Sequence, residues 1–186
     1  MDKAAVISKE KEKNKAVLGG FWTAAYVFLF CAFIGWVWEV TYCYVKHGIW
    51  VERGFLIGPY LPIYGIGGLL IYLLKTNSKK GPLNLFFTSV GVAGIVEYVA
   101  SFVLELIYNK RWWDYSGKFL NINGRVYFFG LIFFGIAGCA GAYFVIPAWL
   151  RLVCKMKRRT AIIIGSLLLT VFFSDVAISL LLQFVI

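Results

Sequence analysis

The sequence lacks the short motifs that mark most nucleotide- and metal-dependent enzymes. It has no Gly-x-x-x-x-Gly-Lys-Ser/Thr phosphate loop, no His-Glu-x-x-His zinc motif and no Gly-x-Ser-x-Gly nucleophile motif. His47 is the only histidine, so a Ser–His–Asp triad is not indicated either. These absences exclude a P-loop hydrolase, and we expect no catalytic residue and no cofactor. Acid–base chemistry on carboxylates is the one catalytic option that remains.

Cysteine is scarce and is not arranged for metal binding. The chain has four cysteines, no Cys-x-x-Cys pair, and every cysteine lies within or at the end of an apolar run: Cys31, Cys43, Cys139 and Cys154. A disulfide framework and a metal site are therefore not expected. Small apolar packing is the default role of such cysteines.

Charge is also scarce, whereas apolar residues are abundant. Only 15% of the residues are charged and 61% are hydrophobic, with a mean hydropathy of +0.78. A chain of 186 residues cannot bury so much apolar surface in its own interior, which excludes a soluble globular enzyme and predicts a multi-pass membrane protein. The net charge of +10 comes from bases between the apolar runs, which favours contact with anionic lipid and argues against nucleic acid as a partner.

Five apolar runs are long enough to be considered as membrane spans, which need about 20 residues. We therefore predict an all-α transmembrane bundle of five helices, a single domain over 21–186 that follows a basic cytoplasmic tail over 1–20. The second run is rich in Gly and Pro, so 53–65 is a candidate re-entrant or unwound segment. The predicted spans are 21–45, 56–74, 84–108, 126–150 and 161–185.

The distribution of bases predicts the orientation. Thirteen Lys and Arg residues lie in the tail, in 75–83 and in 151–160, against six in the other two loops. The positive-inside rule then places the N-terminus in the cytoplasm and the C-terminus outside, in the cell membrane. The loop over 109–125 is expected on the outer side.

Four carboxylates interrupt the apolar runs, each at a cost of about 2.5–3.5 kcal/mol unless it meets protein, water or a partner. On the third run, Gly94 and Ser101 share a helical face with Glu97 and Glu105. We expect these faces to form an acid-lined cavity open to the outside that binds a substrate or carries protons. Protonated acids that only pack against neighbouring helices are the alternative. The four are Glu39, Glu97, Glu105 and Asp175.

The outer loops supply further candidates. Arg53 is a candidate counter-ion for Glu39 or Glu97, or a ligand for an anionic headgroup. Trp113, Asp114, Tyr115 and Asn123 are the candidate residues of the pocket mouth, because aromatic rings beside a carboxylate can hold a cation. An interfacial aromatic belt is the alternative explanation of the rings. Asn123-Gly124 predicts a tight turn.

The fourth run carries a ridge of small residues, Gly135-Ile-Ala-Gly138-Cys-Ala-Gly141. Small residues at this spacing favour the close approach of a neighbouring helix. We expect this ridge to serve packing and not phosphate binding.

Several of these segments together resemble the ABC-transporter permease family of the CmpB type, which consists of small bacterial multi-pass membrane proteins. The similarity covers roughly residues 28–140. The resemblance implies a transport role and a separate ATPase subunit as partner, with no substrate to carry over. It is carried by Gly35-Trp36-Val37-Trp38-Glu39, Arg53-Gly54-Phe55-Leu56-Ile57-Gly58-Pro59, Pro62-Ile63-Tyr64-Gly65, Glu97, Glu105, Trp113-Asp114-Tyr115-Ser116 and Asn123-Gly124-Arg125.

Three functions are open at this point. The first is a permease or transporter subunit with an acidic, aromatic-rimmed outer pocket for a small cationic or amphiphilic molecule. The second is a membrane enzyme that acts on an outer-leaflet lipid or lipid-linked substrate through its Glu and Asp residues. The third is a non-catalytic accessory subunit. Expected partners are membrane lipids, an ATPase subunit, a small-molecule or lipid ligand and a second copy of the chain, and an enzyme is the less favoured class.

Overall fold

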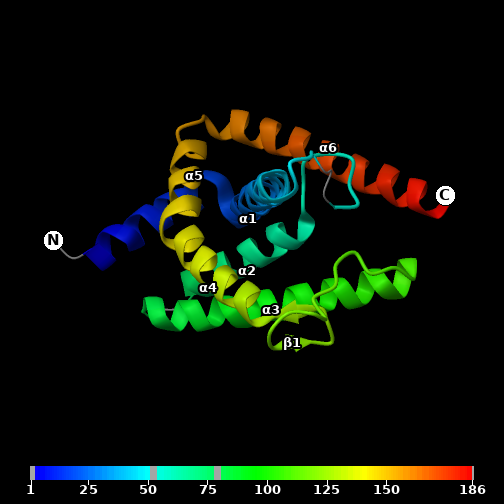
Figure 1. Cartoon of the computed structure of the whole chain (residues 1–186). Coiled ribbons are helices and arrows are strands. Elements are labelled where there is room, and N and C mark those ends of the chain that lie inside the picture. The colour runs from blue at the N-terminus through cyan, green and yellow to red at the C-terminus, as the bar shows by residue number, and fades with distance from the viewer. Residues whose placement is uncertain (1–2, 51–53, 78–80, 186) are drawn as a thin grey trace. The chain divides into compact units, whose positions relative to one another are not determined.

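The computed structural model describes residues 3–50, 54–77 and 81–185, with side chains from residue 18 to residue 182 of these. It is 78% helical, which confirms a nearly all-α fold. The only strands in the described part of the chain form one short antiparallel hairpin. The elements are α1 (Lys3–His47), α2 (Pro62–Asn77), α3 (Pro82–Tyr108), β1 (Asn121–Ile122), β2 (Val126–Tyr127), α4 (Phe128–Ala140), the π-helix η1 (Gly141–Val145), α5 (Ile146–Val153) and α6 (Arg158–Val185) (Figure 1).

Four helical stretches among the described residues are long and apolar enough to cross a membrane. They contain 25 to 30 residues each, or about 37–45 Å at 1.5 Å per residue, against a hydrocarbon core of about 30 Å. Four of the five predicted spans therefore correspond to such helices. The stretches are Leu18–His47, Pro82–Tyr108, Phe128–Val153 and Arg158–Leu182.

The span predicted over 56–74 is not confirmed. Its helix, α2, begins only at Pro62 and has 16 residues, about 24 Å, which is short of the hydrocarbon thickness. Residues 54–61 before it are bends without regular structure. Pro59 and Pro62 explain this late start, because proline lacks the N–H that a helix interior requires and disfavours helical geometry in the preceding residue.

A kink divides α1 near its start. Gly19 has φ 76° and ψ 160°, outside the helical region, whereas the helix continues on both sides. Glycine adopts this left-handed φ without steric cost. The hydroxyl of Thr23 donates to the Gly19 carbonyl at 3.0 Å, which satisfies one acceptor that the kink leaves open.

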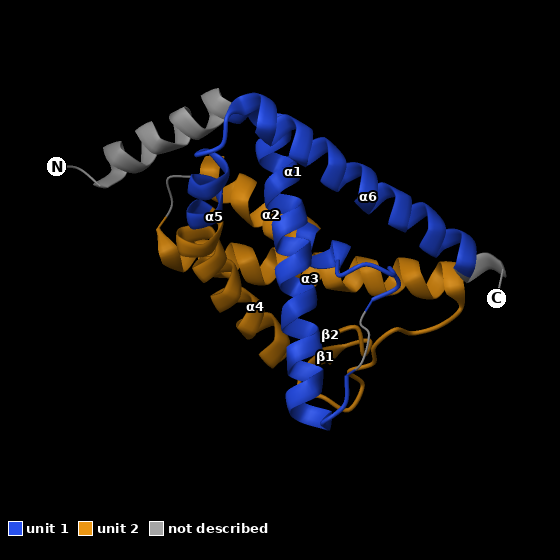
Figure 2. Ribbon diagram, turned by 90° about the horizontal axis from the view of Figure 1, so that it is seen from above, with its two compact units in different colours: residues 1–65, 147–186 blue, residues 66–146 orange. Residues whose placement is uncertain are grey.

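The chain forms two compact units, residues 1–65 with 147–186 and residues 66–146 (Figure 2). In the first unit, α1 packs against α6 through the buried residues Leu18, Tyr26 and Ala161. Tyr26 Oη donates to the Ala161 carbonyl at 2.7 Å, so the hydroxyl group is satisfied inside this apolar contact.

The segment before α2 lies along the middle of α1. The Leu61 N–H donates to the Ala32 carbonyl at 3.0 Å, and Ala32 is near the centre of the apolar stretch Leu18–His47. Gly35 and Gly65 allow this approach, because an added Cβ would lie 2.2 Å from Tyr64 Cγ and 2.7 Å from Phe28 Cε2, respectively. The chain therefore enters α2 from a position at mid-length of a membrane-spanning helix.

In the second unit, α3 packs against α4 and the small-residue ridge serves this contact as predicted. An added Cβ on Gly135 would lie 2.6 Å from Phe86 Cε2, and one on Gly138 would lie 2.6 Å from Ser89 Oγ. Together with the contact of Gly94 with Leu131, these pairs define an antiparallel register. The start of α4 then lies near the level of Glu97, so the last eleven residues of α3 extend beyond it.

Candidate functional site

The four acids predicted from the sequence are divided between the two units. Glu39 and Asp175 belong to the first, and Glu97 and Glu105 belong to the second. Each is therefore described with the groups of its own unit. Arg53, predicted as a counter-ion, lies outside the described residues.

Asp175 of α6 binds the irregular segment that precedes α2. Its Oδ1 accepts the Ile57 N–H at 3.1 Å, and its Oδ2 accepts the Gly58 N–H at 2.8 Å. Ser179, one turn further along α6, donates its hydroxyl to Asp175 Oδ1 at 3.0 Å. Backbone N–H groups outside regular structure need such acceptors at membrane depth, because lipid offers none. This carboxylate thus stabilises the unwound segment.

Glu39 of α1 accepts a hydrogen bond from Tyr64 Oη at 2.6 Å on its Oε1. The ring of Tyr64 lies over Gly35, where any Cβ would overlap with it. Gly35 and Glu39 are one helical turn apart, so the glycine makes room for the ring and the acid holds its hydroxyl. Two segments far apart in the sequence are joined by this single side chain.

Glu97 is the most deeply buried of the four acids, with 8% of its surface exposed. It lies on α3 eleven residues, or about 16 Å, from the helix end at Tyr108. Ser101, one turn further on, is buried on the same face. The face predicted from the spacing of Glu97 and Ser101 is therefore the buried face of this helix.

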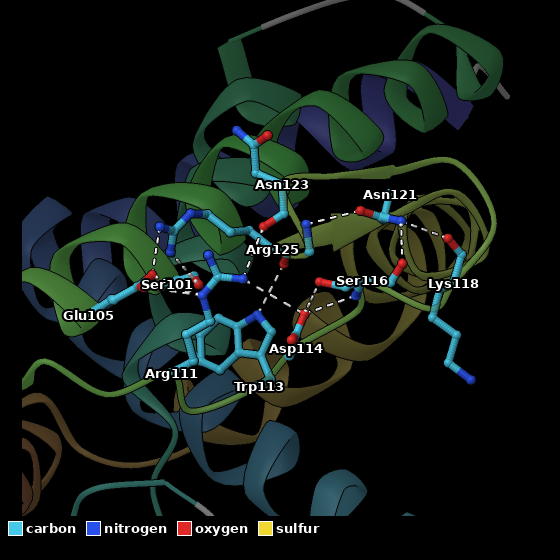
Figure 3. A network of polar contacts seen from close by, with 11 residues as sticks. Ser101, Glu105, Arg111, Trp113, Asp114, Ser116, Lys118, Asn121, Asn123 and Arg125 are labelled. Atoms are coloured by element: carbon cyan, nitrogen blue, oxygen red, sulfur yellow. Dashed lines mark hydrogen bonds and ion pairs between the residues drawn. The ribbon is translucent and has the colours of Figure 1, made fainter.

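Glu105 is held by two arginines that come from the loop after α3 (Figure 3). Arg125 Nη2 lies 2.6 Å from Glu105 Oε2, and Arg111 Nε donates to both carboxylate oxygens at 3.1 Å. Arg125 also donates from Nη1 to Ser101 Oγ at 3.0 Å and is only 8% exposed. Its guanidinium lies 5.4 Å from the centre of the Phe102 ring, a cation–π distance.

The loop that supplies the arginines folds back along α3 as a hairpin. Asn121 pairs with Tyr127 and Ile122 pairs with Val126. Asn123 and Gly124 both have positive φ, 53° and 68°, which is the requirement of the tight turn predicted from their sequence. Asn123 Nδ2 donates to Tyr98 Oη at 2.9 Å, so the turn reaches α3 ten residues before its end.

Asp114 orders the chain next to this turn. Its Oδ1 accepts the backbone N–H of Ser116 at 2.9 Å and the Ser116 hydroxyl at 2.5 Å. These two hydrogen bonds, together with the guanidinium of Arg111 at 3.8 Å, hold the pKa of the Asp114 carboxyl below its ordinary value of 3.8. Gly124 lies against the same group, because an added Cβ would be 2.4 Å from Asp114 Oδ1.

The other predicted mouth residues belong to the same network. Trp113 Nε1 donates to the Arg125 carbonyl at 3.0 Å, and the Tyr115 N–H donates to the Gly124 carbonyl at 2.7 Å. The Tyr115 ring packs on Tyr127 with ring centres 4.6 Å apart. The structure therefore brings Trp113, Asp114, Tyr115 and Asn123 together with Glu105.

Arg111 and Arg125 were missed by the sequence analysis, which named Arg53 as the candidate counter-ion. Arg125 reaches the helix only after the chain turns back at Asn123-Gly124, whereas Arg111 follows the helix end at Tyr108 closely in the sequence. The signal was the position of Arg125 directly after this turn, because a hairpin that returns toward α4 also returns toward the end of α3. In the residues that the structure describes, no cluster of three or more His, Cys, Asp or Glu side chains could hold a metal ion.

The four long apolar helices indicate a multi-pass membrane protein. Comparison of its sequence with known families identifies the family to which it belongs. The model of the family described as "Putative ABC-transporter type IV" matches residues 26–180. The chain belongs to this family, as the resemblance noted above implied, and is a membrane protein of the transporter type. No curated protein and no solved structure matches it.

Proposed function

We propose that the chain is the membrane-spanning permease subunit of a transporter and that Glu97 binds its cargo or carries a proton. The observation that carries the proposal is the burial of this acid at 8% exposure in the interior of an apolar helix. A carboxylate at such a position costs about 2.5–3.5 kcal/mol, so a functional role is its default interpretation. The cargo class that suits an acidic site is a small cationic or amphiphilic molecule.

The contacts of Glu105 and Asp175 indicate structural roles for these two acids. Glu105 is neutralised by Arg125 and Arg111, and Asp175 accepts two backbone N–H groups. Each of these contacts gives the acid a structural role, which explains its presence in a membrane-spanning helix. Within the second unit, the Asp114 and Asn123 side chains are exposed in the loop that follows α3 and would form the entrance to the site.

The proposal includes an orientation and a partner. The N-terminal tail over 1–20 would lie in the cytoplasm and the hairpin outside, in agreement with the excess of bases in the tail and in the 151–160 loop. Residues 54–77 would cross as a broken span, an unwound half followed by α2, which gives five crossings and an external C-terminus. An ATPase subunit would supply the energy, as the family description suggests.

Binding of a model cation tests the role of Glu97. Tetraphenylphosphonium binding to the purified protein in lipid nanodiscs should weaken at least about tenfold in Glu97→Gln, equivalent to about 1.4 kcal/mol. Glu39→Gln is the matched comparison, because it removes the same charge from an acid that accepts a hydrogen bond from Tyr64. Both variants should elute as the parent protein does in size-exclusion chromatography.

Two results would contradict the proposal. Equal affinity of Glu97→Gln and the parent protein would remove Glu97 from the site. No binding by the parent protein would exclude the cationic cargo class. The alternative of an acid–base enzyme has less support, because two arginines bind Glu105, the acid on the same helix that would have to act together with Glu97.

A further inference from the structure

The hairpin after α3 has an apolar outer side. Phe119 and Leu120 are exposed by 62% and 63%, although they lie in the connection between two helices. Leu120 has φ 46°, in the left-handed region that leucine rarely adopts. The Phe119 ring packs against Phe128 and Phe129 with ring centres 6.2 Å apart in both cases. This outer side is therefore continuous with the apolar surface of the membrane-spanning helix that follows.

The hairpin also reaches the depth of the hydrocarbon. Asn123 contacts Tyr98, which lies ten residues, or about 15 Å, before the end of α3. The 27 residues of α3 span about 40 Å, which exceeds the core thickness by about 10 Å. Even if the whole excess projected at this end, Tyr98 would lie about 5 Å inside the hydrocarbon. The hairpin then lies near the boundary between the hydrocarbon and the lipid headgroups.

A groove of about 300 Å³ runs between the hairpin and α3. Ile95, Tyr98 and Val99 line it from α3, Ile122 and Val126 line it from the hairpin, and Leu131 lines it from α4. The groove thus offers an apolar channel along a membrane-spanning helix.

We propose that this groove binds one acyl chain of an anionic phospholipid, with the apolar side of the hairpin covered by neighbouring lipid. The charges of the loop favour the anionic headgroup. Glu105 and Asp114 are engaged with Arg111 and Arg125, which leaves Lys110 and Lys118 as additional exposed bases in residues 105–125. An ammonium group at the interface attracts a lipid phosphate. The groove differs from the cargo site proposed at Glu97, because its lining from α3 is Gly94, Ile95, Tyr98 and Val99.

Photo-crosslinking tests the site in the full-length protein. p-Benzoylphenylalanine at Ile122, inside the groove, should yield a phospholipid adduct in phosphatidylglycerol nanodiscs, detected by intact mass. Adding Ile95→Trp should fill the groove and lower the yield at Ile122 about tenfold, the effect of displacing about two methylene groups. Leu106→Trp, at a residue of α3 that is 74% exposed and outside the groove, should leave the yield unchanged.

The outcomes separate a bound chain from bulk lipid. A yield at Ile122 that is insensitive to Ile95→Trp would overturn the groove site, because bulk lipid contact does not depend on that residue. A lower yield in phosphatidylcholine than in phosphatidylglycerol would support the anionic headgroup, and equal yields would overturn that part. If the Ile122 variant does not fold, Val99 offers the same test from the α3 side, and the absence of an adduct there would overturn the proposal.

Discussion

Arg125 carries its charge into a position that is 8% exposed, where Glu105, Ser101 and the Phe102 ring surround it. Such a charge is tolerated only because a carboxylate lies 2.6 Å away and a hydroxyl group takes a second donor. Arg111 binds the same carboxylate, but its side chain is 36% exposed. We therefore expect the loss of Arg125 to lower the free energy of unfolding more than the loss of Arg111 does.

We expect Arg125→Gln to destabilise the protein by up to about 3 kcal/mol, the low end for a broken buried pair, because Glu105 is partly exposed. Arg111→Gln should cost about 1 kcal/mol or less, as exposed pairs do. Thermal unfolding in detergent micelles, followed by tryptophan fluorescence, measures both. Equal effects of the two variants would contradict the burial of Arg125.

Asp114 predicts a pH dependence of the loop. Its pKa is lowered below 3.8 in the folded protein, so its contribution is fully present above the unfolded pKa and is lost as the pH falls through the folded value. Hydrogen exchange of the Ser116 amide should therefore accelerate, after correction for intrinsic rates, as the pH decreases below about 4. Asp114→Asn should remove this dependence. An unchanged acid response in that variant would assign the effect to another group.

At the scale of elements, the packing of α3 on α4 depends on glycine. Gly138→Ala would place a Cβ 2.6 Å from Ser89 Oγ and 3.0 Å from Ile71 Cδ1, so the helices would have to separate. We expect a loss of about 1–3 kcal/mol, typical of an overpacked contact. Gly91→Ala is the control, because nothing lies within 4 Å of its added Cβ. Equal melting temperatures of the two variants would contradict the register described for α3 and α4.

The unwound segment before α2 depends on α6. Asp175→Ala removes the acceptor of the Gly58 N–H group, whereas the Ile57 N–H group keeps Ser179 Oγ at 3.2 Å as an acceptor. The variant should destabilise the protein by about 1–3 kcal/mol, the cost of one unsatisfied group. Asp175→Asn keeps one carbonyl oxygen and should cost less. Thermal unfolding measures this structural role. If Asp175 served proton transport alone, both Asp175→Asn and Asp175→Ala would abolish transport, and Asp175→Asn would be as stable as the parent protein.

At the scale of the whole molecule, the sequence predicted what depends on local pattern. The four long helices follow from runs of apolar residues, the turn follows from Asn123-Gly124, and the buried face of α3 follows from the spacing of Glu97 and Ser101. The sequence analysis named the Gly- and Pro-rich 53–65 segment as a candidate re-entrant or unwound segment, but it still counted 56–74 as a full span because of its apolar composition, and so it missed the shortness of α2. The pairing of Arg125 with Glu105 was missed because it joins residues 20 positions apart through a fold-back that no local period encodes.

The central claim is that this chain is the membrane subunit of a transporter driven by a separate ATPase. Native mass spectrometry of the protein, extracted gently from its own host, tests the claim most directly. We expect a complex with a nucleotide-binding subunit at fixed stoichiometry, with ATPase activity that is retained after purification. A bare monomer or homo-oligomer that retains a defined small molecule or lipid, with no such subunit after chemical crosslinking in the membrane, would contradict it and indicate a stand-alone carrier or enzyme.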